Sequence, residues 1–273
     1  MGDIFSESLY FKQEKNFEKI NNLTKAFAAN NCGNTIIRDS IFSIVSNYAR
    51  KKELQIQILR YPFNDNELWA FTFVKEGVIF LGVNNELPMC KQIFAVGHEL
   101  YHIHCYAENI DINTIKSLSI LNSKSFDDKI ASQEDLEANA FSGLLLMPDI
   151  HLIEQSMLFG ISKNNIGIEE ILTLMDLFAL PYKAVLLRLV ECGIITREKG
   201  KKLLQEDNAS IIKKIKLTGK AEQWQQNSNQ LVRYGNLLDN ITYNSEQEYL
   251  VDSREKSDKE YLKEIEKKFW NQK

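Results

Sequence analysis

The feature that most constrains this chain is the pattern His98-Glu99-Leu100-Tyr101-His102, inside the apolar stretch CKQIFAVGHELYHIHCY at 90–106. Pro88 suits the first turn of a helix, and apolar residues continue at helical spacing, which predicts one buried helix. On such a helix His98 and His102 are four residues apart and lie within ~40° of each other around the axis, so both imidazoles can point at one ion. Glu99 is rotated by ~100° from His98, where a general base must stand to act on water held at that ion. The spacing therefore predicts two metal ligands and a catalytic carboxylate.

A chance match, with both histidines simply packed in a core, is the alternative interpretation of this pattern. The chain has only four histidines, and three of them fall between 98 and 104 inside an apolar helical sequence, which favours the metal site. His104 lies on another face of the helix, and we expect a surface or supporting role for it. Tyr101 is a candidate donor to a developing oxyanion, although an aromatic residue beside a buried seam more often serves packing.

Composition places the chain among ordinary globular proteins. Its 273 residues are 44% hydrophobic and 26% charged, which is enough to bury a substantial core in one or two domains. A net charge of −4 and a pI of about 5.7 argue against a general nucleic-acid surface. We find no membrane-spanning run and no secretory signal, and the four cysteines lack CxxC spacing, so we expect a cytoplasmic protein with reduced thiols.

The sequence before the motif predicts two helices and then a small sheet. Residues 13–30 and 36–52 have helical periodicity, and strands are expected at 54–61, 68–74 and 78–84, where apolar, aromatic and β-branched residues gather. Because the third strand leads directly into Pro88, we expect the sheet edge to line the metal cleft. An extended peptide can pair with such an edge.

The sequence after the motif offers a candidate for a third ligand. Residues 107–130 are polar and are expected to form a loop or lid, whereas 134–147 predict a second helix that ends at Pro148. Asp135 lies at the start of a face of small or acidic residues on that helix, so its carboxylate can reach the ion. Two imidazoles and a carboxylate suit Zn²⁺ and leave a position for water, although Mn²⁺ or Fe²⁺ can also bind.

Two separated stretches carry a family resemblance, VIFLGVNNELPMCKQIFAVGHELYH and, further along, EDLEANAFSGLLLMP. They resemble the ImmA/IrrE family of zinc metallopeptidases, whose motifs are a strand ending in VN, the HExxH helix, and a helix with a carboxylate four residues before Asn or Asp. The resemblance implies that His98 and His102 are zinc ligands, that Glu99 is the catalytic acid and base, and that Asp135 takes the position of the family's ligand glutamate. Asp135 is one methylene shorter than glutamate. Either the two helices sit closer together, or Glu134 or Glu137 replaces it.

The resemblance also implies an α+β fold and a partner. We expect a small mixed or antiparallel sheet packed on a zincin-like HExxH helix, followed by an all-α C-terminal part. Such proteins relieve a partner repressor, usually by cutting it, and are often encoded by mobile elements or stress operons. A binding protein that sequesters the repressor through the same cleft, without proteolysis, is the alternative.

The sequence predicts three regions: a metallopeptidase domain at 1–160, a helical unit at 161–205 and a polar, mostly helical region at 206–273. The middle unit resembles a helix-turn-helix in outline. Its second helix is mainly Val, Leu and Ala, so we favour bracing of the catalytic unit over DNA binding. The last region has charged residues of both signs at i, i+4 spacing, typical of a solvated helix.

Overall fold

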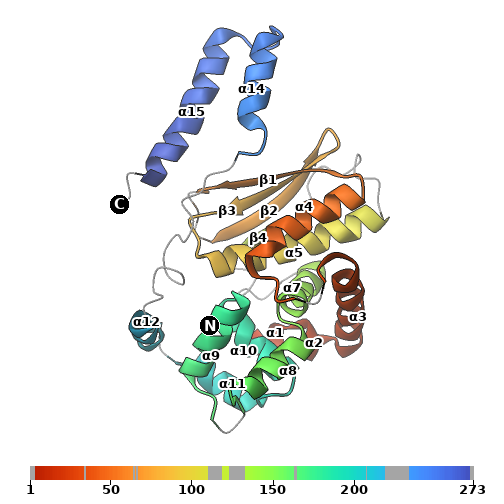
Figure 1. Ribbon diagram of the computed structural model, residues 1–273, viewed down its shortest axis with the longest axis vertical. Helices are drawn as coiled ribbons and strands as arrows, with labels where there is room; N and C mark the ends of the chain where they lie inside the picture. The colour runs from red at the N-terminus through yellow and green to blue at the C-terminus, as the bar shows by residue number, and fades with distance from the viewer. Residues whose placement is uncertain are drawn as a thin grey trace.

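The structure, a computed structural model, describes residues 4–270 except 34, 64, 66, 110–118, 123–132, 163–164, 207 and 219–233. The fold is α+β, as predicted (Figure 1). The elements before the HExxH helix are α1 (Ile4–Glu7), α2 (Leu9–Lys12), α3 (Glu14–Asn31), the 3-10 helix η1 (Arg38–Ser40), α4 (Ile41–Lys51), β1 (Gln55–Tyr61), β2 (Leu68–Lys75) and β3 (Val78–Asn84). The HExxH motif lies on α5 (Met89–Asn109).

A short strand and a series of helices follow α5: β4 (Ser119–Asn122), α7 (Gln133–Leu146), α8 (Asp149–Leu158), α9 (Ile168–Phe178), α10 (Tyr182–Glu191), α11 (Arg197–Leu204), α12 (Asn208–Leu217), α14 (Leu237–Glu246) and α15 (Asp252–Trp270). The helix expected at 134–147 is α7, and the helices expected at 13–30 and 36–52 are α3 and, with η1, α4. No helix among the residues that the structure describes is long and apolar enough to cross a membrane.

The sheet is mixed, with strand order β1-β3-β2-β4. β3 pairs with β1 in parallel and with β2 antiparallel, and β4 pairs antiparallel with the other side of β2. Glu76 and Gly77 join β2 to β3 with φ of 51° and 78°, the left-handed backbone that a tight hairpin turn requires.

The order of the strands and the fourth strand were not predicted from the sequence. β3, which leads to Pro88 and α5, lies inside the sheet, because it pairs in parallel with β1 on one side and antiparallel with β2 on the other. The two edges of the described sheet are β1 and β4. β4 lies within the segment expected to be a loop, 107–130, and contacts α5. α5 itself continues into that segment as far as Asn109, and the residues around β4 lie outside the part that the structure describes.

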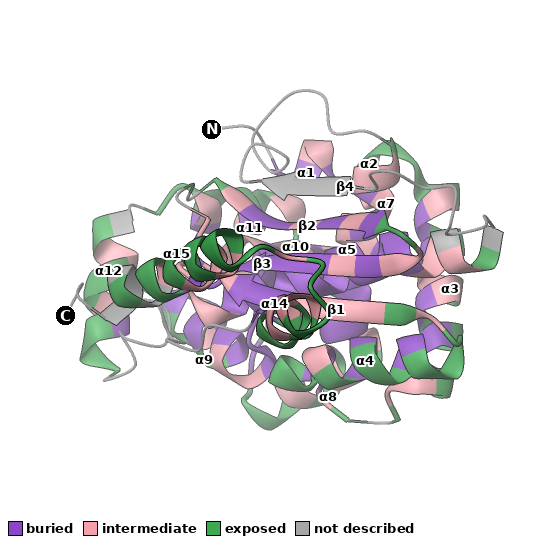
Figure 2. Ribbon diagram, turned by 90° about the horizontal axis from the view of Figure 1, so that it is seen from above, coloured by how far each residue is buried: buried purple, intermediate pink, exposed green. Residues whose placement is uncertain are grey.

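α4 and α5 cover one face of the sheet, and α14 and α15 stand on the side of the other face (Figure 1). Alternate residues of β3, namely Ile79, Leu81 and Val83, are fully buried beneath the sheet, as the period of two in a strand requires. On the opposite face the rings of Phe71, Phe73 and Phe80 stack on one another. Figure 2 shows the burial concentrated on α5 and the strands above it. The core thus fixes α5, which carries the motif.

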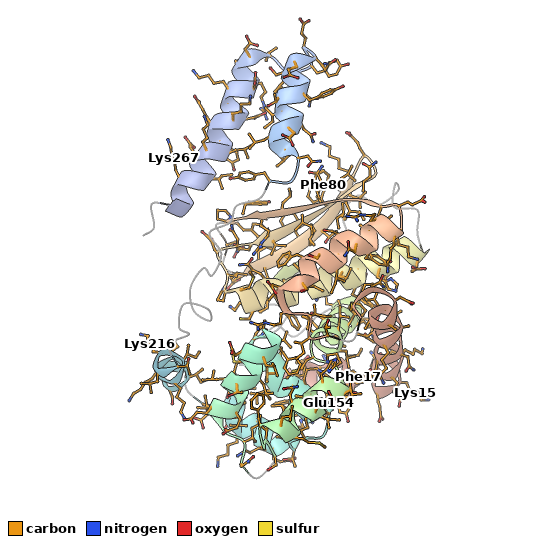
Figure 3. All side chains as sticks on the ribbon, in the orientation of Figure 1. Lys15, Phe17, Phe80, Glu154, Lys216 and Lys267 are labelled. Carbon is orange, nitrogen blue, oxygen red and sulfur yellow. The ribbon has the colours of Figure 1, made fainter. Side chains whose placement is uncertain are left out.

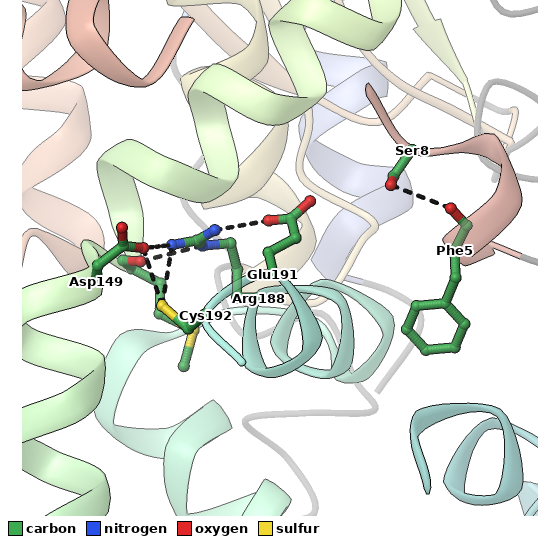
Figure 4. A network of polar contacts seen from close by, with 7 residues as sticks. Phe5, Ser8, Asp149, Arg188, Glu191 and Cys192 are labelled. Carbon is green, nitrogen blue, oxygen red and sulfur yellow. Dashed lines mark hydrogen bonds and ion pairs between the residues drawn. The ribbon is translucent and has the colours of Figure 1, made fainter. Parts of the chain in front are cut away.

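Arg188 on α10 ties the C-terminal helices to α7 and α8. Its buried guanidinium donates to the backbone carbonyl of Met147 at 3.2 Å, to Glu191 at 2.6 Å and to Asp149 (Figure 4). Burial, and to a smaller extent the charge of Asp149, raises the pKa of Glu191 despite the opposing effect of Arg188. Burial also acts to raise the pKa of Asp149, but the charge and hydrogen bond of Arg188 and the Cys192 thiol outweigh it, so that pKa is lowered. Every residue of α10 is buried or partly buried, so the helix is packed into the helical body. The bracing role expected for 161–205 stays a prediction.

Candidate metal centre

His98 and His102 meet at the middle of α5. Both side chains are buried, and their Nε2 atoms face each other at 3.1 Å. The local cause is the four-residue spacing, which places both rings on one side of the helix. Burial, together with the neighbouring His102 ring, lowers the pKa of His98 well below its usual value, so this ring is neutral.

The outer nitrogen of each ring has an acceptor on α7. His98 Nδ1 lies 2.9 Å from Oδ1 of Asn139, and His102 Nδ1 lies 2.9 Å from Oε1 of Glu134. An amide oxygen and a carboxylate oxygen only accept, so each Nδ1 carries the proton. When both rings are neutral, both Nε2 atoms present lone pairs to each other across 3.1 Å. Two facing lone pairs repel unless a cation lies between them, so the histidine pair fits a metal ion.

Asp135 completes the donor set. Its Oδ1 lies 3.8 Å from His98 Nε2, and one ligand atom from each of His98, His102 and Asp135 falls within 4.8 Å of the others. The two histidines are buried, whereas Asp135 is only partly buried, so the group opens toward solvent on the carboxylate side. Two imidazoles and one carboxylate match the ligands of catalytic zinc sites, which keep a further position for water.

Close contact between α5 and α7 explains how the short Asp135 side chain reaches the histidines. Gly97 has no side chain, and a Cβ there would lie 2.5 Å from Oγ of Ser142 on α7. The Ser142 hydroxyl donates to the carbonyl of Phe94 on α5 at 2.8 Å, and its side chain is fully buried. Two small residues therefore let the helices approach, which compensates for the missing methylene.

Glu137, one of the two alternative ligands, is turned away from the histidine pair. Its Oε2 accepts from the Tyr101 hydroxyl at 2.7 Å, and its Oε1 accepts from Gln133 at 2.8 Å. The other alternative, Glu134, contacts the Nδ1 side of His102 rather than Nε2. The Tyr101 hydroxyl, the candidate oxyanion donor, points at Glu137, and burial followed by this hydrogen bond raises its pKa. Of the three candidate carboxylates, only Asp135 joins the Nε2 atoms.

Glu99 follows His98 on α5 and is fully buried. Its carboxylate is therefore removed from bulk water, one residue after the first of the two histidines. His104, in contrast, lies apart from the pair. Its Nδ1 is 2.8 Å from the Tyr48 hydroxyl and its ring packs edge-on against Phe27, so it links α5 to α4 and α3.

The family model that matches this chain is that of the IrrE N-terminal-like domain, Peptidase M78, over residues 51–190. The match covers more than half of the chain. This chain belongs to the IrrE N-terminal-like domain family. No curated protein matches the sequence. The family membership supports a peptidase of the metallopeptidase type, and the matched range contains α5, α7 and every residue of the candidate centre.

Two residues contact the histidines in the structure, and the sequence did not predict these contacts. Asn139, the contact of His98, lies four residues after Asp135 and therefore shares its face of α7. Glu134, the contact of His102, is the residue immediately before Asp135. The sequence did point to Asn139, because the family motif has a carboxylate four residues before an Asn or Asp. The motif gives the spacing of this residue but not its role. Its role required knowing which side of α7 faces α5.

Proposed function

We propose that this chain is a zinc-dependent metallo-endopeptidase that cleaves a protein partner, a transcriptional repressor of a mobile element or stress operon. The observation that carries the proposal is the pair of Nε2 atoms at 3.1 Å, with both Nδ1 atoms held by acceptors and Asp135 beside them. Membership of a peptidase family supports the same reaction class.

His98, His102 and Asp135 would hold the ion. Zinc, when bound, supplies a Lewis acid that makes water a nucleophile near neutral pH and polarises a carbonyl. The rest of the reaction falls to the chain. Glu99 takes the proton from the attacking water and delivers it to the leaving amine, while Asn139 and Glu134 keep the two rings in the tautomer that leaves Nε2 bare.

The substrate in this proposal is an extended peptide. β4 is the outermost strand beside β2 in the described sheet, and it packs near α5, so its outer edge can pair with a substrate strand. Hydrogen bonds between the backbones of β4 and the substrate would hold the scissile bond across the metal centre, whatever most of the substrate side chains are. A protein partner with an accessible linker suits such an edge strand better than a small molecule does.

Replacement of Glu99 by Gln tests proteolysis against simple sequestration of the partner. Glu99→Gln keeps the size of the side chain and removes the base, so we expect it to bind zinc and the partner but to lose roughly 10²- to 10⁴-fold in cleavage rate. The purified, zinc-loaded chain is incubated with the repressor encoded beside its gene, and fragments are followed with time. Repression is measured in parallel in cells.

The matched control is Glu18→Gln, the same chemical change at an exposed position on α3, which should cleave like wild type. If Glu99→Gln relieves repression as well as wild type does, the chain acts by binding and the proteolytic proposal fails. If wild type binds the repressor without producing fragments, the antirepressor alternative replaces it.

A further inference from the structure

A pocket lies where α10 packs against α1 and α7, and it encloses about 730 Å³ of space, part of it open to solvent. Its walls are mainly apolar, with Leu9, Phe94, Leu136 and Leu187 among the lining residues. Pockets of this size and character hold small organic molecules. None of the three candidate metal ligands lines it, so it is separate from the metal centre. We call it the α10 pocket.

One buried carboxyl group in the α10 pocket has an oxygen that the protein leaves unbound. The Glu191 side chain is only 3% exposed, and its Oε2 accepts from Nη1 of Arg188 at 2.6 Å. Its Oε1 has no hydrogen bond to any residue that the structure describes. In Figure 4 this second oxygen points away from Arg188, on the side where Ser8 lies, and Ser8 also lines the pocket. A polar atom held in an apolar pocket without a partner favours a ligand that supplies one.

Arg188 does not balance the charge of Glu191, because two carboxyl groups share its guanidinium. The same side chain donates to Asp149 and to the backbone carbonyl of Met147. If Glu191 and Asp149 were both ionised, this buried group would carry one surplus negative charge. Burial instead raises the pKa of Glu191, which favours its protonated form. A cationic group in the pocket can take the place of that proton.

The other charged side chains around the pocket do not fill this position. Glu7 is paired with Lys12, and Lys183 lies eight residues before Glu191, about 12 Å away along α10. A ligand with a cationic head at Glu191 can therefore place its tail against the apolar walls. A ligand with an anionic head would meet a carboxylate there instead.

Asn139 connects the α10 pocket to the metal centre. It lines the pocket, and its Oδ1 lies 2.9 Å from Nδ1 of His98. Phe94, also in the pocket wall, lies one helical turn before His98 on α5. A ligand that packs against Asn139 restricts the side chain that orients His98, and so favours the arrangement that a metal ion needs. By linkage, the ligand and the ion then raise each other's affinity.

We propose that the α10 pocket is a second binding site, for a small molecule with an apolar body and a primary ammonium head that pairs with Glu191, and that its occupation strengthens zinc binding through Asn139. The second part rests on the proposed zinc site, whereas the first part does not. The natural ligand is then an effector of the peptidase.

Calorimetric titration of n-hexylamine into the full-length, metal-free chain measures binding in the absence of a metal that the amine could coordinate. An amine of this size should bind with a dissociation constant on the order of 0.1 to 1 mM. n-Hexanoate has the same tail and the opposite charge, and it should bind at least about tenfold more weakly. A wild-type chain that does not bind the amine at roughly 10 mM, or that binds hexanoate equally well, overturns the proposal.

Two variants test the place of the amine. Glu191→Gln removes the charge and keeps an oxygen for Arg188, and it should weaken hexylamine binding by about tenfold or more. Its matched control is Glu154→Gln, the same change at the exposed position on α8 that Figure 3 labels, and this variant should bind like wild type.

Ala140→Leu leaves the buried charges intact and fills the pocket from α7, so it should abolish binding, whereas Ala29→Leu at an exposed position of α3 should not. Thermal unfolding checks that each variant is folded. A folded Ala140→Leu chain that binds the amine like wild type contradicts the proposed location.

Competition with a chelator measures zinc affinity with and without saturating hexylamine. Affinity should rise by about threefold or more in wild type and stay unchanged in Ala140→Leu. A wild-type affinity that bound hexylamine does not change removes the effector role. Because the amine is titrated first into the metal-free chain, a chain that binds no zinc leaves that result standing, so failure of the zinc site and failure of the α10 pocket are distinguishable.

Discussion

Substitution of Gly97 by Ala tests whether the close approach of α5 and α7 positions the metal centre. The new Cβ would lie 2.5 Å from the Ser142 Oγ and 3.3 Å from both the Ser142 Cβ and Leu146 Cδ1. Since ordinary contacts begin near 3.4 Å, either Ser142 rotates and loses its bond to the Phe94 carbonyl, or α7 moves outward by roughly 1 Å. Either response acts on the helix that carries Asp135.

The two responses have similar costs. Leaving the buried Ser142 hydroxyl without its acceptor costs about 1 to 3 kcal/mol, and overpacking costs a similar amount. Alanine is favoured over glycine in a helix by about 1 kcal/mol, which offsets part of this. We therefore expect Gly97→Ala to lower the free energy of unfolding by about 0 to 2 kcal/mol. Zinc affinity should fall by about tenfold or more, because Asp135 and Asn139 move with α7.

Denaturant unfolding of the metal-free chain and zinc titration against a competing chelator measure the two quantities. Ser142→Ala is the matched second substitution, because it removes the oxygen that clashes with the new methyl. In Gly97→Ala/Ser142→Ala the nearest atoms to that methyl are Leu146 Cδ1 and the Cβ of residue 142, both at 3.3 Å. The double variant should recover stability and zinc affinity relative to Gly97→Ala, with a coupling energy of about 0.5 to 3 kcal/mol. A Gly97→Ala chain that is more stable than wild type and binds zinc equally well would refute the reasoning.

Three further outcomes are expected at the centre itself. Elemental analysis should find about one zinc per chain, and His98→Ala should lose it; an unchanged metal content would remove the site. Asp135→Ala should lower zinc affinity far more than Glu137→Ala, because only Asp135 lies with the Nε2 atoms, whereas Glu137 is bound to Tyr101. Tyr101→Phe should change the cleavage rate only a few-fold, since the hydroxyl is committed to Glu137; a loss of roughly 10²-fold or more would show that it stabilises an oxyanion instead.

Prediction from sequence worked where the cause is local. His98 and His102 lie on the same side of α5 because they are four residues apart on one helix. The boundaries of β1, β2 and β3 follow from short apolar segments that end at turns. The hairpin at Glu76 and Gly77 is local as well. In each case neighbouring residues in the chain supply the forces that decide the geometry.

Prediction from sequence failed where the geometry depends on strands that are distant in the sequence. Nothing local distinguishes a β3 at the sheet edge from one between β1 and β2, because strand order depends on which neighbours complete its hydrogen bonds. β4 is a strand of only four residues in a polar segment, and it exists because β2 offers it an unpaired edge.

The chain by itself determined the chemistry of the centre, two imidazoles and an adjacent carboxylate on one helix, because helical periodicity places them without help from the rest of the fold. Only the tertiary structure decided which acidic residue of α7 joins them. Rotation of α7 about its own axis is set by its packing against α5 at Gly97 and Ser142. That packing turns Asp135 and Asn139 toward His98, leaves Glu134 on the outer nitrogen of His102, and gives Glu137 to Tyr101.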